Sequence, residues 1–284
     1  MSEAWLSLGG LGVRLCGGAG VDAAMRIDGM AHFATGSRRT DITLHLDSAP
    51  MPDNIAVLHS FDIADGAARC RFGTDNEGSY VYLFDGLGAT RFDPRRPDEA
   101  YCSAIQSQPL MKFALWTMFS MTGLWRGVLP VHSSVAVCDG KAVMCLGESG
   151  TGKSTHTRLW LANIPGTRLL NDDSPLLSLA GGRPVVCGSP WSGKTPCYRQ
   201  ECHPAAAAVR IVQRPKNTIE RLGVVEAFAA LQPSCPPCLM KDERLQDRLV
   251  DFVGRAIGAM PVYRLGCRPD AEAAHLCHNT VFAL

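Results

Sequence analysis

Residues 147–154 carry the strongest chemical signal in this sequence. They read Gly-Glu-Ser-Gly-Thr-Gly-Lys-Ser and fit the template G-x-x-x-x-G-K-[ST] at every fixed position. The glycines allow backbone conformations closed to residues with a Cβ, so successive N–H groups can converge on phosphate oxygens. Lys153 is expected to reach the β and γ phosphates, and Ser154 to ligate a nucleotide-bound Mg²⁺. The motif predicts a nucleotide-binding set made of Gly147, Glu148, Ser149, Gly150, Thr151, Gly152, Lys153, Ser154 and Thr155.

The flanks of this loop support the same interpretation. Residues 141–146 form a short, mostly apolar run typical of a buried strand. Residues 155–162 carry Leu159 and Trp160 at helical spacing and contain neither Pro nor Gly. Strand, loop and helix is the context of a phosphate-binding P-loop, and it disfavours the alternative of a glycine-rich turn without a ligand.

An acidic pair supplies the second part of a chemical site, because turnover needs metal ligands and a group that activates a nucleophile. Asp172 and Asp173 follow the apolar pair Leu169-Leu170, as expected at the end of a strand. Adjacent side chains on a strand point to opposite faces, so one carboxylate can face a substrate hydroxyl while the other reaches toward Mg²⁺. The alternative is a solvated turn at Asn-Asp-Asp-Ser-Pro.

His132, the 147–154 loop and the run Arg-Leu-Leu-Asn-Asp-Asp at residues 168–173 resemble, in type and order, the catalytic core of HPr kinase/phosphorylase. The resemblance covers about residues 128–175. It implies that Asp172 is the general base for a serine hydroxyl, that Lys153 and His132 belong to the catalytic centre, and that Asp173 supports the metal with Ser154. For His132 an ordinary core position is the alternative, since serines replace the glycine that usually follows.

A second glycine loop departs from that family. The family's Glu-Ile-Arg-Gly motif is not visible after the acidic pair, and the segment Gly-Ser-Pro-Trp-Ser-Gly-Lys stands at residues 188–194. This segment is similar to one in HPr-kinase-related proteins encoded beside enzymes that modify ribosomal peptides. Trp191, Ser192 and Lys194 are therefore expected to contact phosphate or substrate, with the lysine neutralising phosphate charge.

Arg210 and Arg214 are expected to be ordinary surface arginines near this site.

The expected function is a kinase that uses ATP and Mg²⁺ to phosphorylate a serine-type hydroxyl of a peptide or small protein. The departure from the family motif argues against assuming the phosphorylase half-reaction or HPr as acceptor. Three alternatives stay open: a kinase of free serine or another small alcohol, an enzyme similar to PEP carboxykinase, and a nucleotide-binding regulator without turnover. The regulator is disfavoured because it would need no general base, whereas Asp172 is present. The carboxykinase is disfavoured because no substrate-clamping arginine motif is recognisable in the sequence.

Composition narrows the class of partner. The chain has 284 residues with 46% hydrophobic content, enough for one large or two modest domains. Its net charge of +1 gives no broad field that favours nucleic acid or a membrane surface. The apolar stretch at residues 113–125 is too short to cross a bilayer and is expected to be a buried helix. A homo-oligomer is compatible with these features.

Cysteine usage and the N-terminus indicate a cytoplasmic protein. The N-terminus lacks the basic and apolar segments of a secretory signal, and twelve cysteines are scattered through expected strands and helices. This scatter favours reduced thiols, most of them small buried hydrophobes. Zinc binding by Cys197, Cys202 and His203 with Cys235 and Cys238 is the weaker alternative, and a redox role for the last pair is weaker still.

The expected fold is α/β, with a smaller β-rich N-terminal domain at residues 1–108 and a P-loop kinase core at 109–284 of the HPr kinase/PEP carboxykinase type. Hairpin signals at 68–84 mark the first domain, and a turn at residues 139–140 marks the second. Residues 217–231 and 242–259 are expected to be helices. The N-terminal domain is expected to help recognise the acceptor; covering the core or building an oligomer is the alternative.

Overall fold

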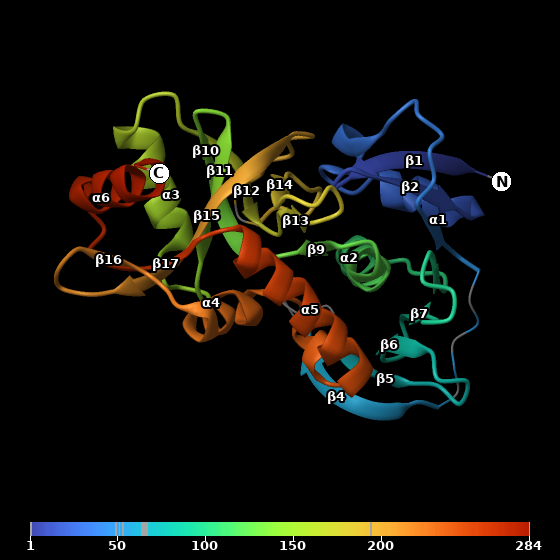
Figure 1. Cartoon of the computed structure of the whole chain (residues 1–284). Coiled ribbons are helices and arrows are strands. Elements are labelled where there is room, and N and C mark those ends of the chain that lie inside the picture. Colours follow the sequence, from blue (N-terminus) through green and yellow to red (C-terminus); the bar gives the residue numbers. More distant parts are fainter. Residues whose placement is uncertain are drawn as a thin grey trace. The chain divides into compact units, whose positions relative to one another are not determined.

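The computed structural model in Figure 1 describes residues 2–48, 50, 52, 54–63, 68–193 and 195–283. These residues form a mixed α/β fold with two multi-stranded sheets and six α-helices. Contacts divide the chain into an N-terminal unit, Met1–Val128 with Cys238–Arg248, and a P-loop unit, Leu129–Pro237 with Leu249–Leu284. The expected α/β class is confirmed at this level.

The N-terminal unit contains an eight-stranded sheet in the order β1-β2-β3-β8-β7-β6-β5-β4. The β2–β3 and β3–β8 pairs are parallel, and the remaining pairs are antiparallel. Its strands are β1 (Glu3–Leu8), β2 (Leu11–Cys16), β3 (Ile42–His45), β4 (Ala56–Asp62), β5 (Arg69–Thr74), β6 (Tyr80–Phe84), β7 (Gly88–Phe92) and β8 (Glu99–Cys102). Its helices are α1 (Gly18–Met25), the 3-10 segment η1 (Met30–Phe33) and α2 (Gln108–Trp125).

The hairpin β5–β6 and the helix α2 confirm two predictions for this unit. Cys70 lies opposite Phe84 in the antiparallel pair, as the turn signals between the strands predicted. Pro109 lies in the first turn of α2, where its missing N–H costs no helical hydrogen bond. Because α2 packs on α1, β3, β7 and β8, contacts group it with the N-terminal sheet, whereas the sequence placed the domain boundary at residue 108. Among the described helices, none is both long and apolar enough to pass through a bilayer.

The P-loop unit is built on a second mixed sheet, which the topology gives as nine-stranded. Its main path is β12-β10-β11-β15-β14-β13-β9, and β17 adds to β15 and carries β16. The strands are β9 (Val128–Pro130), β10 (Ser133–Cys138), β11 (Lys141–Leu146), β12 (Arg168–Asp173), β13 (Leu176–Ser178), β14 (Val185–Cys187), β15 (Cys202–Gln213), β16 (Thr218–Arg221) and β17 (Val262–Cys267). The helices are α3 (Lys153–Asn163), α4 (Val224–Leu231), α5 (Glu243–Ala259), which spans the division between units, and α6 (Ala271–Phe282), with 3-10 segments η3 (Gln232–Ser234) and η4 (Pro237–Met240).

The core of this unit explains why its central strands read as continuous apolar runs. Val143 of β11 and Val209 of β15 pack in one cluster with Trp160 of α3 and Cys277 of α6, the two helices that lie side by side in Figure 1. Met144, on the opposite face of β11, is also fully buried. Strands buried on both faces have no alternation of polar and apolar residues, and this is the pattern found at 141–146.

The segment at residues 217–231 corrects one prediction, because only its second part is helical. Thr218–Arg221 forms β16 and pairs antiparallel with β17. The Leu222 N–H donates to Val262 O at 2.9 Å, and α4 begins after Gly223. Helical spacing of apolar residues in the sequence was overridden by pairing with a strand some forty residues later, which local patterns do not report.

The cysteines bring a second correction. Cys187 and Cys202 form a disulfide, and they lie opposite each other in the β14–β15 pair with Cα atoms 4.0 Å apart. The expectation of reduced thiols therefore fails for this pair. The other cysteines are free, and most are buried, as predicted. A disulfide also removes Cys202 as a thiolate ligand, so the zinc set weighed from the sequence loses this member.

Candidate nucleotide and phosphate site

The glycine loop follows β11 directly and has the backbone that the motif requires. Gly147, Gly150 and Gly152 have φ angles of 148°, 82° and 101°, a region that favours glycine. A Cβ at Gly147 would lie 2.4 Å from the Thr151 hydroxyl, so the close approach also excludes a side chain. Thr151 Oγ1 donates to Glu148 O at 2.8 Å and closes the turn. Helix α3 starts immediately after Gly152 with its N-terminus at the loop, a favourable place for an anion.

Lys153 lies across this loop and is 8% exposed. Its Nζ donates to Gly147 O at 2.7 Å and Glu148 O at 3.0 Å, and it lies 3.0 Å from His132 Nε2. An ammonium has three N–H donors, and all three have partners here. Burial lowers the pKa of Lys153, while the charges of the two aspartates oppose that shift. The lysine is thus positioned between the loop carbonyls and the acidic pair.

Ser154 and Asp172 form the second contact of the cluster. The Ser154 hydroxyl, on the first turn of α3, donates to Asp172 Oδ1 at 2.7 Å. Both groups offer oxygen atoms, the ligand type that Mg²⁺ prefers, and a P-loop hydroxyl next to a strand-end aspartate is the arrangement that holds this ion in P-loop enzymes. The residues present therefore fit Mg²⁺.

His132 and Asp173 form the third contact. His132 Nδ1 lies 3.1 Å from Asp173 Oδ1, and both side chains are roughly half-exposed. Since the ammonium of Lys153 can only donate, His132 Nε2 accepts, and a neutral imidazole then carries its hydrogen on Nδ1 and donates it to the carboxylate. A chain of polar contacts runs from the loop lysine through the histidine to the second aspartate.

Strand register explains why these residues converge. In the β10–β12 pair Ser133 lies opposite Asp173, and in the β10–β11 pair it lies opposite Leu146. His132 just precedes β10 and the glycine loop just follows β11, so both meet the end of β12 at one edge of the sheet. The structure therefore brings together His132, Lys153, Ser154, Asp172 and Asp173, which are dispersed over more than forty positions of sequence.

The second glycine loop, residues 188–193, lies beside the acidic pair. The Gly193 N–H donates to Asp172 O at 2.8 Å, and Ser192 forms an isolated β-bridge with Asp173. Trp191 and Ser192 are buried, and the Ser192 hydroxyl donates to Thr195 O at 2.7 Å. These contacts hold the loop in place. Lys194, which the sequence predicted to contact phosphate, lies outside the described residues.

Two further residues lie near the site: Asn171, which was not predicted from the sequence, and Arg210, which was expected at the surface and whose side chain is 20% exposed. Asn171 is fully buried; its amide donates to Ser189 O at 3.3 Å and its Oδ1 accepts the Ser174 N–H at 3.1 Å, so it fixes the second loop against β12. Arg210 of β15 pairs with Glu148 of the glycine loop at 3.4 Å. An asparagine inside a strand, directly before the acidic pair, was the available signal for the first.

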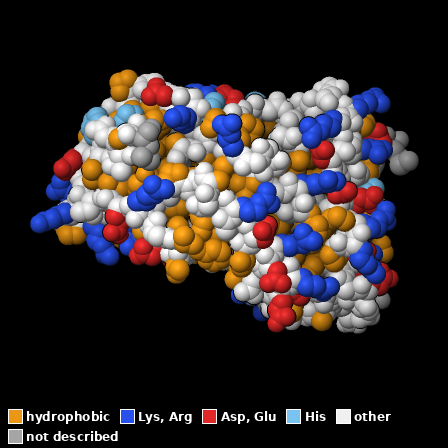
Figure 2. Space-filling model, viewed as in Figure 1, with side chains coloured by type: hydrophobic (Ala, Val, Ile, Leu, Met, Phe, Trp, Pro, Cys, Tyr) orange, Lys and Arg blue, Asp and Glu red, His pale blue; other side chains and the backbone are white. Residues whose placement is uncertain are grey.

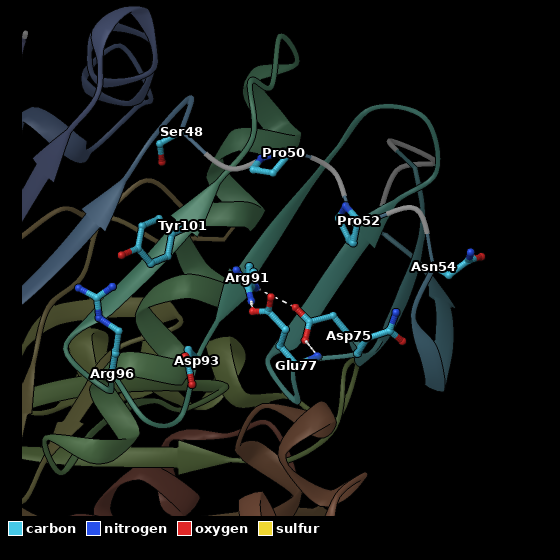
Figure 3. Close-up of a pocket in the computed structure, with 11 residues that line it drawn as sticks. Ser48, Pro50, Pro52, Asn54, Asp75, Glu77, Arg91, Asp93, Arg96 and Tyr101 are labelled. Carbon is cyan, nitrogen blue, oxygen red and sulfur yellow. Dashed lines mark hydrogen bonds and ion pairs between the residues drawn. The ribbon is translucent and has the colours of Figure 1, made fainter.

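A pocket of about 740 Å³ lies in the N-terminal unit, and its lining differs in chemistry from the P-loop cluster (Figure 3). Arg91 lies between Asp75 and Glu77 there and makes an ion pair with each, at 2.8 Å with Asp75. Arg96 and Tyr101 line another part of it. Figure 2 likewise shows basic and acidic side chains interspersed on the visible face, without a gathering of one sign. This pocket contains surface ion pairs and none of the residues of the P-loop cluster.

Comparison of the chain with models of known protein families gave no match, and comparison with curated proteins gave none either.

Proposed function

We propose that this chain is a Mg²⁺- and nucleoside-triphosphate-dependent kinase with a P-loop core of the HPr kinase type, which transfers the γ-phosphoryl group to a serine-type hydroxyl of a peptide or small protein. One observation carries the proposal: a glycine loop with its buried Lys153 lies in contact with both a hydroxyl–carboxylate pair and a histidine–carboxylate pair. Nucleotide binding alone needs the loop; the two carboxylate pairs supply what group transfer needs in addition.

The contacts favour a division of roles between the aspartates that reverses the one expected from the sequence. Ser154 and Asp172, hydrogen-bonded to each other, would hold Mg²⁺, which when bound neutralises phosphate charge. Asp173, which contacts His132 and is partly exposed, is then the carboxylate left to receive a proton from the acceptor. Lys153 would bind phosphate oxygens through donors that now bind the loop carbonyls.

Phosphoryl transfer in this site would form one bond to phosphorus and break another. The acceptor hydroxyl oxygen forms a bond to the γ-phosphorus, the bond from that phosphorus to the β–γ bridging oxygen breaks, and the nucleoside diphosphate leaves. The hydroxyl proton passes to the Asp173 carboxylate. Before the transfer, His132 stabilises the charge of this carboxylate by donating a hydrogen bond from Nδ1–H. A cytoplasmic location, where ATP is abundant, suits such a reaction.

The test is incubation of the full chain with γ-labelled ATP and separate acceptors: a panel of serine- and threonine-containing peptides, free serine, and water alone. We expect label on peptide serine, dependent on Mg²⁺, at a rate well above release to water. Label on free serine alone would move the acceptor to a small alcohol. Nucleotide binding without transfer to any acceptor would indicate a regulator and overturn the kinase proposal.

A further inference from the structure

A second cavity, of about 600 Å³, opens beside the glycine loop within the P-loop unit. One wall is the loop and the start of α3, with Gly150, Gly152, Thr155 and Leu159. The described lining includes neither Lys153 nor either aspartate of the acidic pair. The loop thus has the acidic cluster on one side and this cavity on another. Its volume falls in the range of about 300–1000 Å³ found for small-molecule sites.

The far wall comes from the ends of two neighbouring parallel strands. Ile211 lies within β15, Gln213 is its last residue, and Pro215 follows it. Pro269 follows β17, the parallel neighbour of β15. Together with Leu159 these side chains make a largely apolar lining. Gln213 also donates to Gly150 O at 3.3 Å, which joins this wall to the glycine loop. Apolar walls of this kind suit a flat, weakly polar group better than they suit phosphate.

Two arginines line the cavity, and they differ in whether their guanidinium groups are ion-paired. Arg268 is engaged with Asp270 at 3.0 Å and Glu272 at 3.4 Å. Arg214 is exposed and makes no ion pair with any residue in the described ranges. A free guanidinium above an apolar lining can stack on an aromatic ring or donate to ring and ribose oxygens.

His156 has a buried polar atom close to this cavity. It lines the cavity and is 2% exposed. Its Nε2 accepts the Trp160 Nε1–H at 3.0 Å, so the neutral ring carries its hydrogen on Nδ1. That Nδ1 is buried and has no hydrogen-bond partner among the described residues. Such donors are rare in folded proteins, and because this atom is out of contact with solvent, the inference rests on the position and lining of the cavity.

We infer that this cavity binds the nucleoside part of the phosphoryl donor, with Arg214 contacting the base or ribose, while the phosphates lie along the glycine loop toward Lys153. The inference rests on the proposed function for the phosphate end only. It makes the donor a nucleoside triphosphate, because an inorganic polyphosphate would leave the cavity empty. Arg214 is exposed, as the sequence predicted, and the inference gives it a role in addition.

The first test compares ATP with inorganic tripolyphosphate by calorimetry, both with Mg²⁺. We expect ATP to bind at least about tenfold more tightly, a difference of about 1.4 kcal/mol. Arg214→Ala should weaken ATP binding several-fold and leave tripolyphosphate affinity unchanged, whereas the matched control Arg221→Ala, an exposed arginine of β16, should change neither. Lys153→Ala should weaken both.

The outcomes separate the two proposals. Equal affinity for ATP and tripolyphosphate, or an equal loss of both in Arg214→Ala, would overturn the nucleoside cavity and leave the kinase proposal standing. Failure of both ligands to bind would overturn both proposals. A second measurement locates the base directly: photolysis with 8-azido-ATP should label peptides that contain residues 155–159, 211–215 or 267–269. Labelling confined to other peptides would contradict the inference.

Discussion

Both units of this molecule carry ion pairs near the surface, and they differ in that the P-loop unit also holds a buried lysine beside an acidic pair. In the N-terminal unit, Arg91 binds Asp75 and Glu77, and Arg71 binds Asp85 at 2.9 Å, and among these side chains Asp75 is the most buried. In the P-loop unit, Lys153 is buried and contacts His132, which contacts Asp173, while the neighbouring Ser154 contacts Asp172. The larger pocket belongs to the first unit and the chemical cluster to the second.

Of the two cavities described, the larger therefore does not contain the P-loop cluster, so cavity size alone does not identify the candidate site. Ion pairs between exposed groups are solvated and contribute little free energy, and each charge is already matched by its neighbour. A buried lysine holds its charge where water screens it poorly, so on the proposed function its interaction with phosphate would be strong. Four predictions test this contrast, from the largest expected effect to the smallest.

The largest effect is expected at Lys153. Lys153→Ala should lower phosphoryl transfer by at least about a thousandfold and weaken nucleotide binding, because it removes the cation that faces the transferring phosphate. Product formation and calorimetry with ATP measure the two effects. The control Lys141→Ala removes an exposed lysine of β11 in the same unit and should leave both unchanged. Near-normal activity of Lys153→Ala would show that the buried lysine has no role in phosphoryl transfer.

Substitutions in the acidic pair should give the next largest effects, and the two aspartates should differ in which kinetic property they change. Asp172→Asn is expected to raise the Mg²⁺ concentration needed for activity, since its carboxylate is hydrogen-bonded to the Ser154 hydroxyl. Asp173→Asn should leave Mg²⁺ dependence intact while lowering kcat by about a hundredfold, the usual scale for losing a general base. Rates measured across a Mg²⁺ titration distinguish them. The reverse pattern would restore the roles that the sequence predicted.

A pH effect on stability should come from His156. Burial lowers its pKa from 6.5 to about 4, so between these values the unfolded state binds more protons than the folded state. The free energy of unfolding should therefore fall as pH drops, by about 2 kcal/mol from pH 7.5 to 5 for this group. Urea unfolding at the two pH values measures the slope. His156→Gln should flatten it, and His275→Gln, at an exposed position of α6, should not.

The smallest effect is expected in the N-terminal pocket. Arg91→Ala should lower the free energy of unfolding by less than about 1 kcal/mol, because its ion pairs are partly exposed. ATP affinity and hydrolysis in water should match those of the unaltered chain. If this unit helps to recognise the acceptor, as we expect, only KM for the peptide rises. Loss of ATP binding in this variant would show that the nucleotide site depends on this pocket.

Much of the local structure was predictable because it depends on neighbouring residues. The turn between β10 and β11 formed at Asp139 and Gly140, whose φ angles are 49° and 73°, as the sequence pair predicted. The strand and helix that flank the glycine loop also appeared where expected. The segment Thr218–Arg221 could not be assigned this way, since its strand exists only through pairing with β17.

By itself the sequence determined the conformation of the glycine loop, since the glycine spacing and the following lysine specify its backbone and its charge. It also determined that an acidic pair ends a strand. Only the tertiary structure decided which aspartate meets Ser154 and which meets His132, because that depends on the register of β12 against β10. The pairing of Cys187 with Cys202, and the cavity at Arg214, were decided in the same way, by strands that approach in space and not in sequence.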